Sequence, residues 1–226
     1  RYAHDPNRTW LTGHSMGGHG TWNLGLTLPD QWAAIAPSAG WATFWSYTGP
    51  DRYPKDDGVR EILHRAANPS DTMLMLPNAR RFGIYVLHGD ADSVVPVSEA
   101  RAMRTALAGF HGDFAYFEEP GAGHWWGDQC MDFPDLMAFL QRHTLGEDGH
   151  RDQLTFVTVD PSASATCDWV QIQQQAVSLQ PSRVDLQIVR TNDTVRIEGR
   201  TENVTALTLD LSHPDIDGTG PLEVAL

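Results

Sequence analysis

The sequence has few cysteines and few basic residues, and it has no long apolar run. Its 226 residues include two cysteines, Cys130 and Cys167, which are too few for a disulfide framework and form no CxxC pair. The two thiols fit either a bridge between the two halves of the chain or two buried free thiols. No stretch is apolar enough to span a bilayer and no signal peptide is visible, so no membrane span is expected. The compartment stays open, with a secreted or periplasmic location slightly favoured over a cytoplasmic one.

Basic residues are outnumbered. The chain has 16 Lys and Arg against 29 Asp and Glu, a formal net charge of -13. A protein that binds a phosphate backbone needs a basic face, so the charge argues against a nucleic-acid partner. Acidity of this kind keeps a protein soluble, and a hydrophobic fraction of 41% is enough for a sizeable core.

Motifs for metals and cofactors are also missing. None of the 10 histidines has metal-ligand spacing such as HExxH, and there is no Walker A loop. The run Gly18-His19-Gly20 lacks the third glycine of a dinucleotide-binding fingerprint. The sequence therefore predicts neither a metal nor a cofactor.

Short apolar runs and helical segments alternate up to about residue 145. An alternation of this kind predicts a parallel sheet covered by helices, an α/β domain. The predicted strands are residues 8–12, 32–36, 83–87 and 114–117, the predicted helices are residues 16–28, 59–67, 98–110 and 133–143, and residues 41–57 are expected to form a loop.

The pattern changes after the polar, glycine-containing segment 146–151. Apolar and polar residues then alternate at 184–188, 195–197 and 207–211, which is typical of half-buried antiparallel strands, and residues 191–193 (TND) fit a hairpin turn. We therefore predict two domains. Residues 1–146 would form the α/β domain, and residues 152–226 a small β-rich module, sandwich-like and possibly incomplete at its abrupt end.

One short motif suggests a nucleophile. Residues 13–17 (GHSMG) match G-x-S-x-G, in which a chain leaves a strand, turns sharply and enters a helix with the serine at the tip. Side chains two positions before and after Ser15 are expected to collide in so tight a turn, which explains Gly13 and Gly17. The N-terminus of the following helix would favour a developing anion near Ser15.

Candidate partners for the serine follow in the required order of acid and then base. Asp90 and Asp92 come after the strand 83–87, where site groups gather, and Asp92 is favoured as the acid. The alternative is that one or both hold the turn or cap the helix near Ser98. His124 lies in a glycine-flanked loop after the strand 114–117 and is the candidate base.

Other histidines and several tryptophans lie near these motifs. His14 is a candidate for shaping the pocket, and His88 is expected to form a hydrogen bond within its own turn. Aromatic walls suit an apolar, aromatic or sugar-containing substrate, with core or lid packing as the equal alternative. The candidate substrate-binding residues are Trp41, Trp45, Trp125 and Trp126.

Three motifs in order, GHSMGGHGTW, HGDADSVVP and GAGHWW, resemble the α/β-hydrolase superfamily, and within it the prolyl oligopeptidase-related peptidases and esterases. The resemblance covers roughly residues 6–145. It implies that Ser15 is the nucleophile, Asp92 the acid, His124 the base, and the Met16 N–H one donor of the oxyanion hole. It implies no role for the β module.

The chain departs from the family pattern at its start. In the family the serine follows the fifth strand, and the earlier strands and the loop that gives the second oxyanion donor lie upstream. The resemblance therefore implies a fragment that lacks the N-terminal half of the fold. Its strand 8–12 would be a bare edge, and the chain alone should aggregate or need a partner.

The expected function is acyl transfer through a Ser-His-Asp triad, by a serine peptidase or a related carboxylesterase. The alternatives are a carbohydrate esterase of acetyl or feruloyl type and a non-catalytic carbohydrate- or ligand-binding protein on a hydrolase fold. A third is a chain left inert by an incomplete oxyanion hole. The expected partner is a small-molecule ester or peptide substrate, with a saccharide-linked one as an option, and the oligomeric state is open.

Overall fold

The computed structural model describes residues 5–49, 57–145, 152–191, 194–212 and 221–226. The chain divides into two compact units, Arg1–Glu147 and Asp148–Leu226. The polar segment 146–151 and two residues of the expected hairpin turn, 192 and 193, lie outside the described residues.

The first unit is built on a parallel sheet, as the alternation of apolar runs predicts. Its strands lie in the order β1-β2-β3-β4, and each neighbouring pair is parallel. The two central strands are buried along their whole length, whereas β1 and β4 are partly buried. The strands are β1 (Trp10–His14), β2 (Ala34–Ser38), β3 (Gly83–Gly89) and β4 (Phe114–Glu119).

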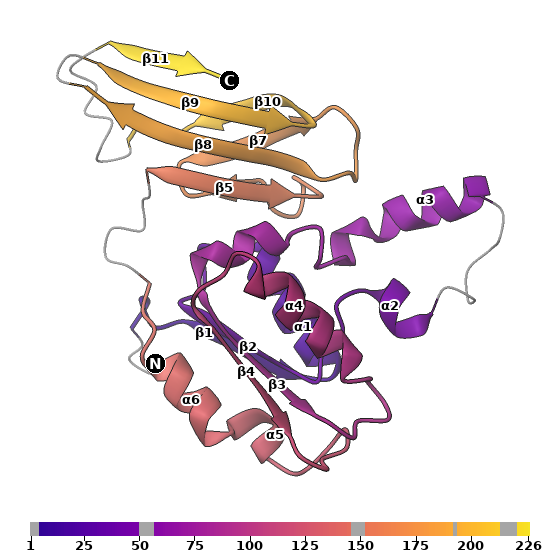
Figure 1. The fold of residues 1–226 in the computed structure, drawn as a ribbon. Helices are drawn as coiled ribbons and strands as arrows, with labels where there is room; N and C mark the ends of the chain where they lie inside the picture. The colour runs from indigo at the N-terminus through magenta and orange to yellow at the C-terminus, as the bar shows by residue number, and fades with distance from the viewer. Residues whose placement is uncertain (1–4, 50–56, 146–151, 192–193, 213–220) are drawn as a thin grey trace. The chain divides into compact units, whose positions relative to one another are not determined.

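Helices cover both faces of this sheet (Figure 1): α1 and α4 lie on one face, and α5 and α6 on the other. Alternate residues of the central strands therefore meet different helices, and this is why the strands are apolar on both faces. The helices are α1 (Met16–Thr27), α2 (Phe44–Thr48), α3 (Asp57–Ala67), α4 (Ser98–Ala108), α5 (Gln129–Asp132) and α6 (Pro134–Gln141), with short 3-10 helices at Asn68–Ser70 and Leu76–Arg81.

The packing on each face shows this division. Beneath α6, one cluster joins Ala36, Leu87, Phe139 and other buried side chains. On the opposite face α1 approaches β2 so closely that a Cβ on Gly25 would lie 2.8 Å from the Ile35 side chain. The sheet is therefore the middle layer of three.

Several predicted boundaries were wrong. The first strand begins at Trp10 and continues through Gly13 to His14, and the second runs through Pro37. Pairing of β2 with β3 skips from Ile35 to Ser38, so a proline without an N–H fits there. The expected loop 41–57 contains a short helix, α2, whose N-terminus is a capping box between Thr43 and Ser46.

The second unit is a sandwich of two sheets, with strand orders β11-β9-β8-β5 and β10-β7-β6. The predicted strands at 184–188, 195–197 and 207–211 pair antiparallel with their neighbours, whereas β11, a strand that was not predicted, pairs parallel with β9. The strands are β5 (Gln153–Thr158), β6 (Thr166–Cys167), β7 (Val170–Gln175), β8 (Ser182–Arg190), β9 (Val195–Glu202), β10 (Val204–Leu209) and β11 (Leu222–Ala225).

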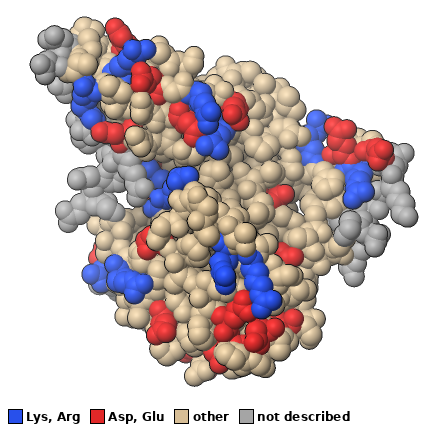
Figure 2. All heavy atoms as spheres, viewed as in Figure 1, with Lys and Arg blue, Asp and Glu red and all other residues tan. Residues whose placement is uncertain are grey.

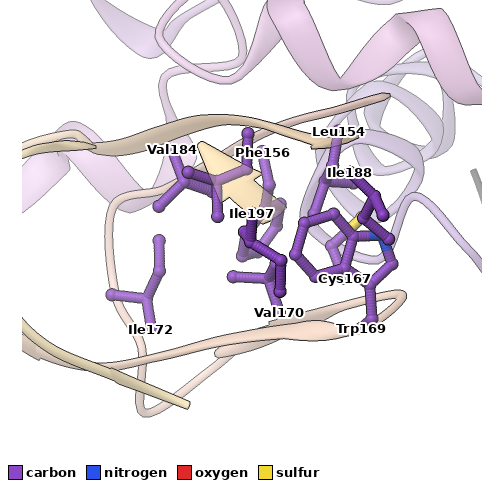
Figure 3. Close-up of a cluster of buried hydrophobic side chains, with 10 residues drawn as sticks. Leu154, Phe156, Cys167, Trp169, Val170, Ile172, Val184, Ile188 and Ile197 are labelled. Atoms are coloured by element: carbon purple, nitrogen blue, oxygen red, sulfur yellow. The ribbon is translucent and has the colours of Figure 1, made fainter. Parts of the chain in front are cut away.

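Side chains from the two sheets of this unit point toward one another (Figure 3). Phe156, Val184 and Ile197 come from one sheet, and Val170 and Ile172 from the other, and all five are buried. Period-two alternation thus places one side of each strand in a shared apolar core.

The outer face of the larger sheet is charged. Residues of β8 alternate, so Val184 points inward while Arg183 and Asp185 point outward. Asp185 accepts hydrogen bonds from Arg183, Thr155 and Arg200, and the guanidinium of Arg183 lowers the pKa of this carboxyl to about 2. Figure 2 shows acidic and basic side chains interspersed on this module.

Neither cysteine is part of a disulfide. Cys130 belongs to α5 in the first unit and Cys167 to β6 in the second, and each is buried. In the described part of the chain, no helix has both the length and the apolar character that a membrane crossing requires.

Candidate active site

Ser15 occupies the turn between β1 and α1. Its backbone has φ 60 and ψ -118, a conformation that a non-glycine residue adopts at a cost of about 1–3 kcal/mol. Two backbone hydrogen bonds hold it there: the Ser15 N–H donates to the Ser38 carbonyl at 2.9 Å, and the His19 N–H donates to the Ser15 carbonyl at 3.0 Å. The strand-to-helix turn that the motif predicts is present.

The glycines around the serine do not all serve the same purpose. A Cβ on Gly13 would lie 2.4 Å from the Gly17 carbonyl oxygen, and one on Gly18 would lie 2.2 Å from the Ser38 carbonyl oxygen. A Cβ on Gly17 would meet no atom of the described residues within 4 Å. The prediction that collision explains both motif glycines is therefore right for Gly13 and wrong for Gly17. The next residue, Gly18, is instead the second position at which a side chain would not fit.

Three side chains from three separate segments meet beside this turn. His124 Nε2 lies 2.8 Å from Ser15 Oγ, and His124 Nδ1 lies 2.7 Å from Asp92 Oδ2. The segments follow β1, β3 and β4, and the carboxyl ends of parallel strands share one edge of the sheet. This topology brings together residues 109 positions apart in the chain.

The two aspartates after β3 do different things. Asp92 is buried, and its Oδ1 accepts the N–H groups of Val94 and Val95 at 2.8 and 2.9 Å, which leaves Oδ2 for His124. Asp90 is exposed, and its Oδ1 accepts the Gly121 N–H at 2.7 Å. Asp90 thus fixes the turn that leads to His124, and neither aspartate caps α4, which has no side-chain cap.

The loop that carries His124 packs directly against the end of β3. A Cβ on Gly89 would lie 2.4 Å from the carbonyl oxygens of both Ala122 and Gly123. The Ala91 N–H donates to the Ala122 carbonyl at 3.0 Å. Gly89 is therefore the residue that lets the loop of the imidazole approach the loop of the carboxylate.

The start of α1 offers a donor beside Ser15. Met16 is the first residue of the helix, where a backbone N–H has no intrahelical acceptor, and its side chain is 74% exposed. Within the described residues no group of three or more His, Cys, Asp or Glu side chains could hold a metal ion.

The sequence profile of the prolyl oligopeptidase family matches residues 1–147. The chain belongs to the prolyl oligopeptidase family. The α/β-hydrolase resemblance inferred from the three motifs is thereby confirmed.

Relatives of this family member are longer proteins. An uncharacterized secreted protein of Arthroderma benhamiae is 30% identical over 125 residues, which cover 54% of this chain and 13% of that protein. A thermostable esterase of known structure is 24% identical over 62% of this chain and 32% of its own, with a TM-score of 0.42. The acylaminoacyl peptidase of Pyrococcus horikoshii is 19% identical over 55% of this chain and 21% of its own, with a TM-score of 0.45.

In this family member His14 lies beside the His124 imidazole, and Trp125 and Trp126 lie edge-on to His14. His14 Nδ1 lies 3.1 Å from Ser38 Oγ, and its ring centroid lies 4.8 Å from that of His124 and 5.2 Å from that of Trp125. Burial lowers the pKa of His14, as does the neighbouring His124. Trp125 is 64% exposed, whereas Trp126 is partly buried and packs against the apolar cluster between the sheet and α6.

The other two candidate tryptophans pack within aromatic groups. Trp41 is 4% exposed and is stacked between His19 and Tyr47, at centroid distances of 5.0 and 4.4 Å. Trp45 is stacked on His64 of α3. Trp125 is therefore the candidate tryptophan that offers a large exposed surface, next to His14 and the loop of His124.

Sequence reasoning missed Glu99. This carboxylate is buried, and its Oε2 accepts the Ala42 N–H at 3.0 Å and the Ser46 hydroxyl at 2.8 Å. It fixes the segment that follows β2, between Trp41 and α2. A glutamate in the first turn of a helix indicates a solvated helix start, so the sequence pattern gives no sign of burial.

Proposed function

We propose that this chain carries the active site of a serine hydrolase that works by acyl transfer. The observation that carries the proposal is the unbroken hydrogen-bonded series from Ser15 through His124 to Asp92, with 2.8 and 2.7 Å between the heavy atoms. A serine hydroxyl is a weak nucleophile until a base takes its proton and a carboxylate orients that base.

In the proposed reaction, Ser15 Oγ attacks the substrate carbonyl while His124 Nε2 takes the hydroxyl proton. Asp92 holds the Nδ1–H and stabilises the imidazolium. The Met16 N–H stabilises the oxyanion of the tetrahedral intermediate. His124 then gives the proton to the leaving alcohol or amine, and water enters by the same steps and releases the acid.

The proposed substrate is a carboxylic ester or a peptide. Trp125 supports an aromatic or apolar group next to the scissile bond, because its indole is 64% exposed near His124 and is held edge-on by His14. Matched ester and amide substrates with one acyl group would separate esterase from peptidase. A carbohydrate ester is the second candidate, since an exposed indole also stacks on sugar rings.

The non-catalytic alternative, saccharide binding through the β module, has less support. From residue 152 to the end the sequence contains two aromatic residues, Phe156 and Trp169. Both are buried in the core between the sheets, at 0% and 1% exposure. Stacking on a sugar requires an exposed aromatic face, which neither residue offers.

Fluorophosphonate labelling tests the proposal, because this reagent modifies only an activated serine. The experiment uses the intact natural protein with Ser15→Ala and His124→Ala variants, and Asp90→Asn as the matched control. We expect labelling of the wild type and the control, and none of the two variants. A folded wild-type protein that resists the reagent would refute the hydrolase assignment.

A further inference from the structure

His88 lies next to the carboxylate of the candidate triad. It is on β3, its side chain is fully buried, and its Nε2 lies 2.9 Å from the Val95 carbonyl oxygen and 3.4 Å from Asp92 Oδ2. Asp92 Oδ2 is the same oxygen that His124 Nδ1 contacts at 2.7 Å. One carboxylate oxygen thus lies near two imidazoles.

The tautomer of His88 follows from its partners. A carbonyl oxygen can only accept, so the hydrogen bond to Val95 places the proton on Nε2. The same N–H group lies close to the Asp92 carboxylate, because Nε2 is 3.4 Å from Oδ2. Among the described residues, His88 Nδ1 is buried and has no hydrogen-bond partner.

The ring is held neutral by its surroundings. Burial is the largest cause that lowers the pKa of His88, and nearby His124 lowers it further, while Asp92 and Glu118 act in the opposite direction. A neutral donor suits this position. A full positive charge there would compete with His124 for the carboxylate.

Packing alone does not explain a histidine here. Every residue of β3 is buried, and an apolar side chain would fill the space without a buried ring nitrogen that lacks a partner. Leaving such a group unsatisfied lowers stability. The gain must therefore lie in what the Nε2–H does.

We propose that His88 is a positioning residue that fixes the Asp92 carboxylate, and the turn that carries it, so that Oδ2 meets His124. Its Nε2–H, bonded to the Val95 carbonyl, lies beside Oδ2, while the N–H groups of Val94 and Val95 hold Oδ1. The inference rests on the proposed hydrolase function and concerns the orientation of its acid.

The test is a matched pair of variants in the intact protein, His88→Gln and His88→Asn. Glutamine places an amide N–H near the Nε2 position, whereas asparagine places one near Nδ1, so only glutamine can reach Val95 and Asp92. Hydrolysis of an activated p-nitrophenyl ester is followed across pH, and thermal unfolding checks that both variants fold.

We expect His88→Asn to lower kcat about 10-fold or more with KM within about 2-fold, and His88→Gln to restore most of the loss. The acidic limb of the kcat profile should move to higher pH in His88→Asn, because a carboxylate without the nearby Nε2–H attracts the imidazolium of His124 more strongly. A purely structural role would lower stability without moving that limb.

Equal kcat values and equal pH profiles for two folded variants would overturn the inference. An equal loss of kcat in both variants, without a shift of the acidic limb of the kcat profile, would also overturn it. If asparagine prevents folding, His88→Leu takes its place. Fluorophosphonate labelling of the wild type separates the two proposals. A labelled wild type with unaffected variants refutes only the role of His88, and an unlabelled wild type refutes the hydrolase itself.

Discussion

The two units of this chain differ in which polar groups they bury. In the α/β unit the described buried side chains include the ionisable groups of His19, His88, Asp92 and Glu99. In the β module the buried polar side chains described are hydroxyls, those of Thr158, Ser164 and Ser182. Burying an ionisable group is costly unless it is paired or hydrogen-bonded. Among the described residues, the buried carboxylates and imidazoles thus belong to the unit that carries the proposed active site.

The β module keeps its charges on its outer face instead. Asp185 lies between Arg183 and Arg200, and Glu198 lies beside Arg196 and Gln187. These pairs are partly exposed, so each contributes little to stability. The comparison predicts that substitutions in the first unit change the reaction and that substitutions in the second change stability.

The largest expected effect is that of Asp92→Asn. Asparagine keeps the shape but cannot hold the required tautomer of His124, so kcat should fall on the order of 10³–10⁴-fold. Asp90→Asn is the control, because it keeps the acceptor for the Gly121 N–H. Steady-state ester hydrolysis measures both. Equal activities would mean that the buried carboxylate does not take part in the reaction.

Next comes Trp169→Ala in the β module. This indole is 1% exposed within the apolar core, so its removal should lower the free energy of unfolding by about 3–5 kcal/mol. Denaturant unfolding followed by circular dichroism measures the loss, and Val177→Ala, at a side chain 47% exposed, is the control. A fall in kcat at a temperature where the variant is folded would contradict the division of roles.

Glu99→Ala should affect both quantities moderately. The buried Ala42 N–H would lose its acceptor, at about 1–3 kcal/mol in unfolding free energy, whereas the exposed Ser46 hydroxyl keeps the Thr43 carbonyl. Because Glu99 orders the segment around Trp41, we also expect a higher KM for bulky esters. Glu61→Ala on the exposed α3 serves as the control. An unchanged KM would limit Glu99 to a stabilising role.

The smallest expected effect is that of Asp185→Asn, and it depends on pH. The folded-state pKa of Asp185 is lowered to about 2 from an ordinary value of 3.8, so its ion pair stabilises the protein above pH 3.8. This stability is lost as the pH falls through 2. We expect wild type and variant to differ by about 1 kcal/mol at neutral pH and to converge near pH 2. Thermal melts between those pH values would show it, and a difference that persists at pH 2 would contradict it.

Sequence patterns predicted the elements that depend on local rules. The alternation of apolar runs gave the parallel sheet, and the period of two gave the β module. The order of Ser15, Asp92 and His124 could be read because strand ends of a parallel sheet share one edge. None of these inferences required knowing which residues approach each other closely.

Close approaches are what the sequence could not reveal. That Gly18 rather than Gly17 is crowded depends on the position of the Ser38 carbonyl, 20 residues later in the chain. The burial of Glu99 depends on Ala42 and Ser46, which lie in the segment after β2 and donate hydrogen bonds to its carboxylate. The parallel pairing of β11 with β9 likewise depends on a partner that periodicity does not identify.

The unequal crowding of the glycines implies an unequal pattern of mutational tolerance. In a library of random substitutions, position 13 should accept only glycine, because any Cβ would overlap the Gly17 carbonyl. Position 18 should be equally restricted by the Ser38 carbonyl. Position 17 is helical and open, so alanine should survive there. A descendant of this protein could therefore replace Gly17, the last glycine of the G-x-S-x-G motif, and keep the turn. A search for the motif alone would miss that protein.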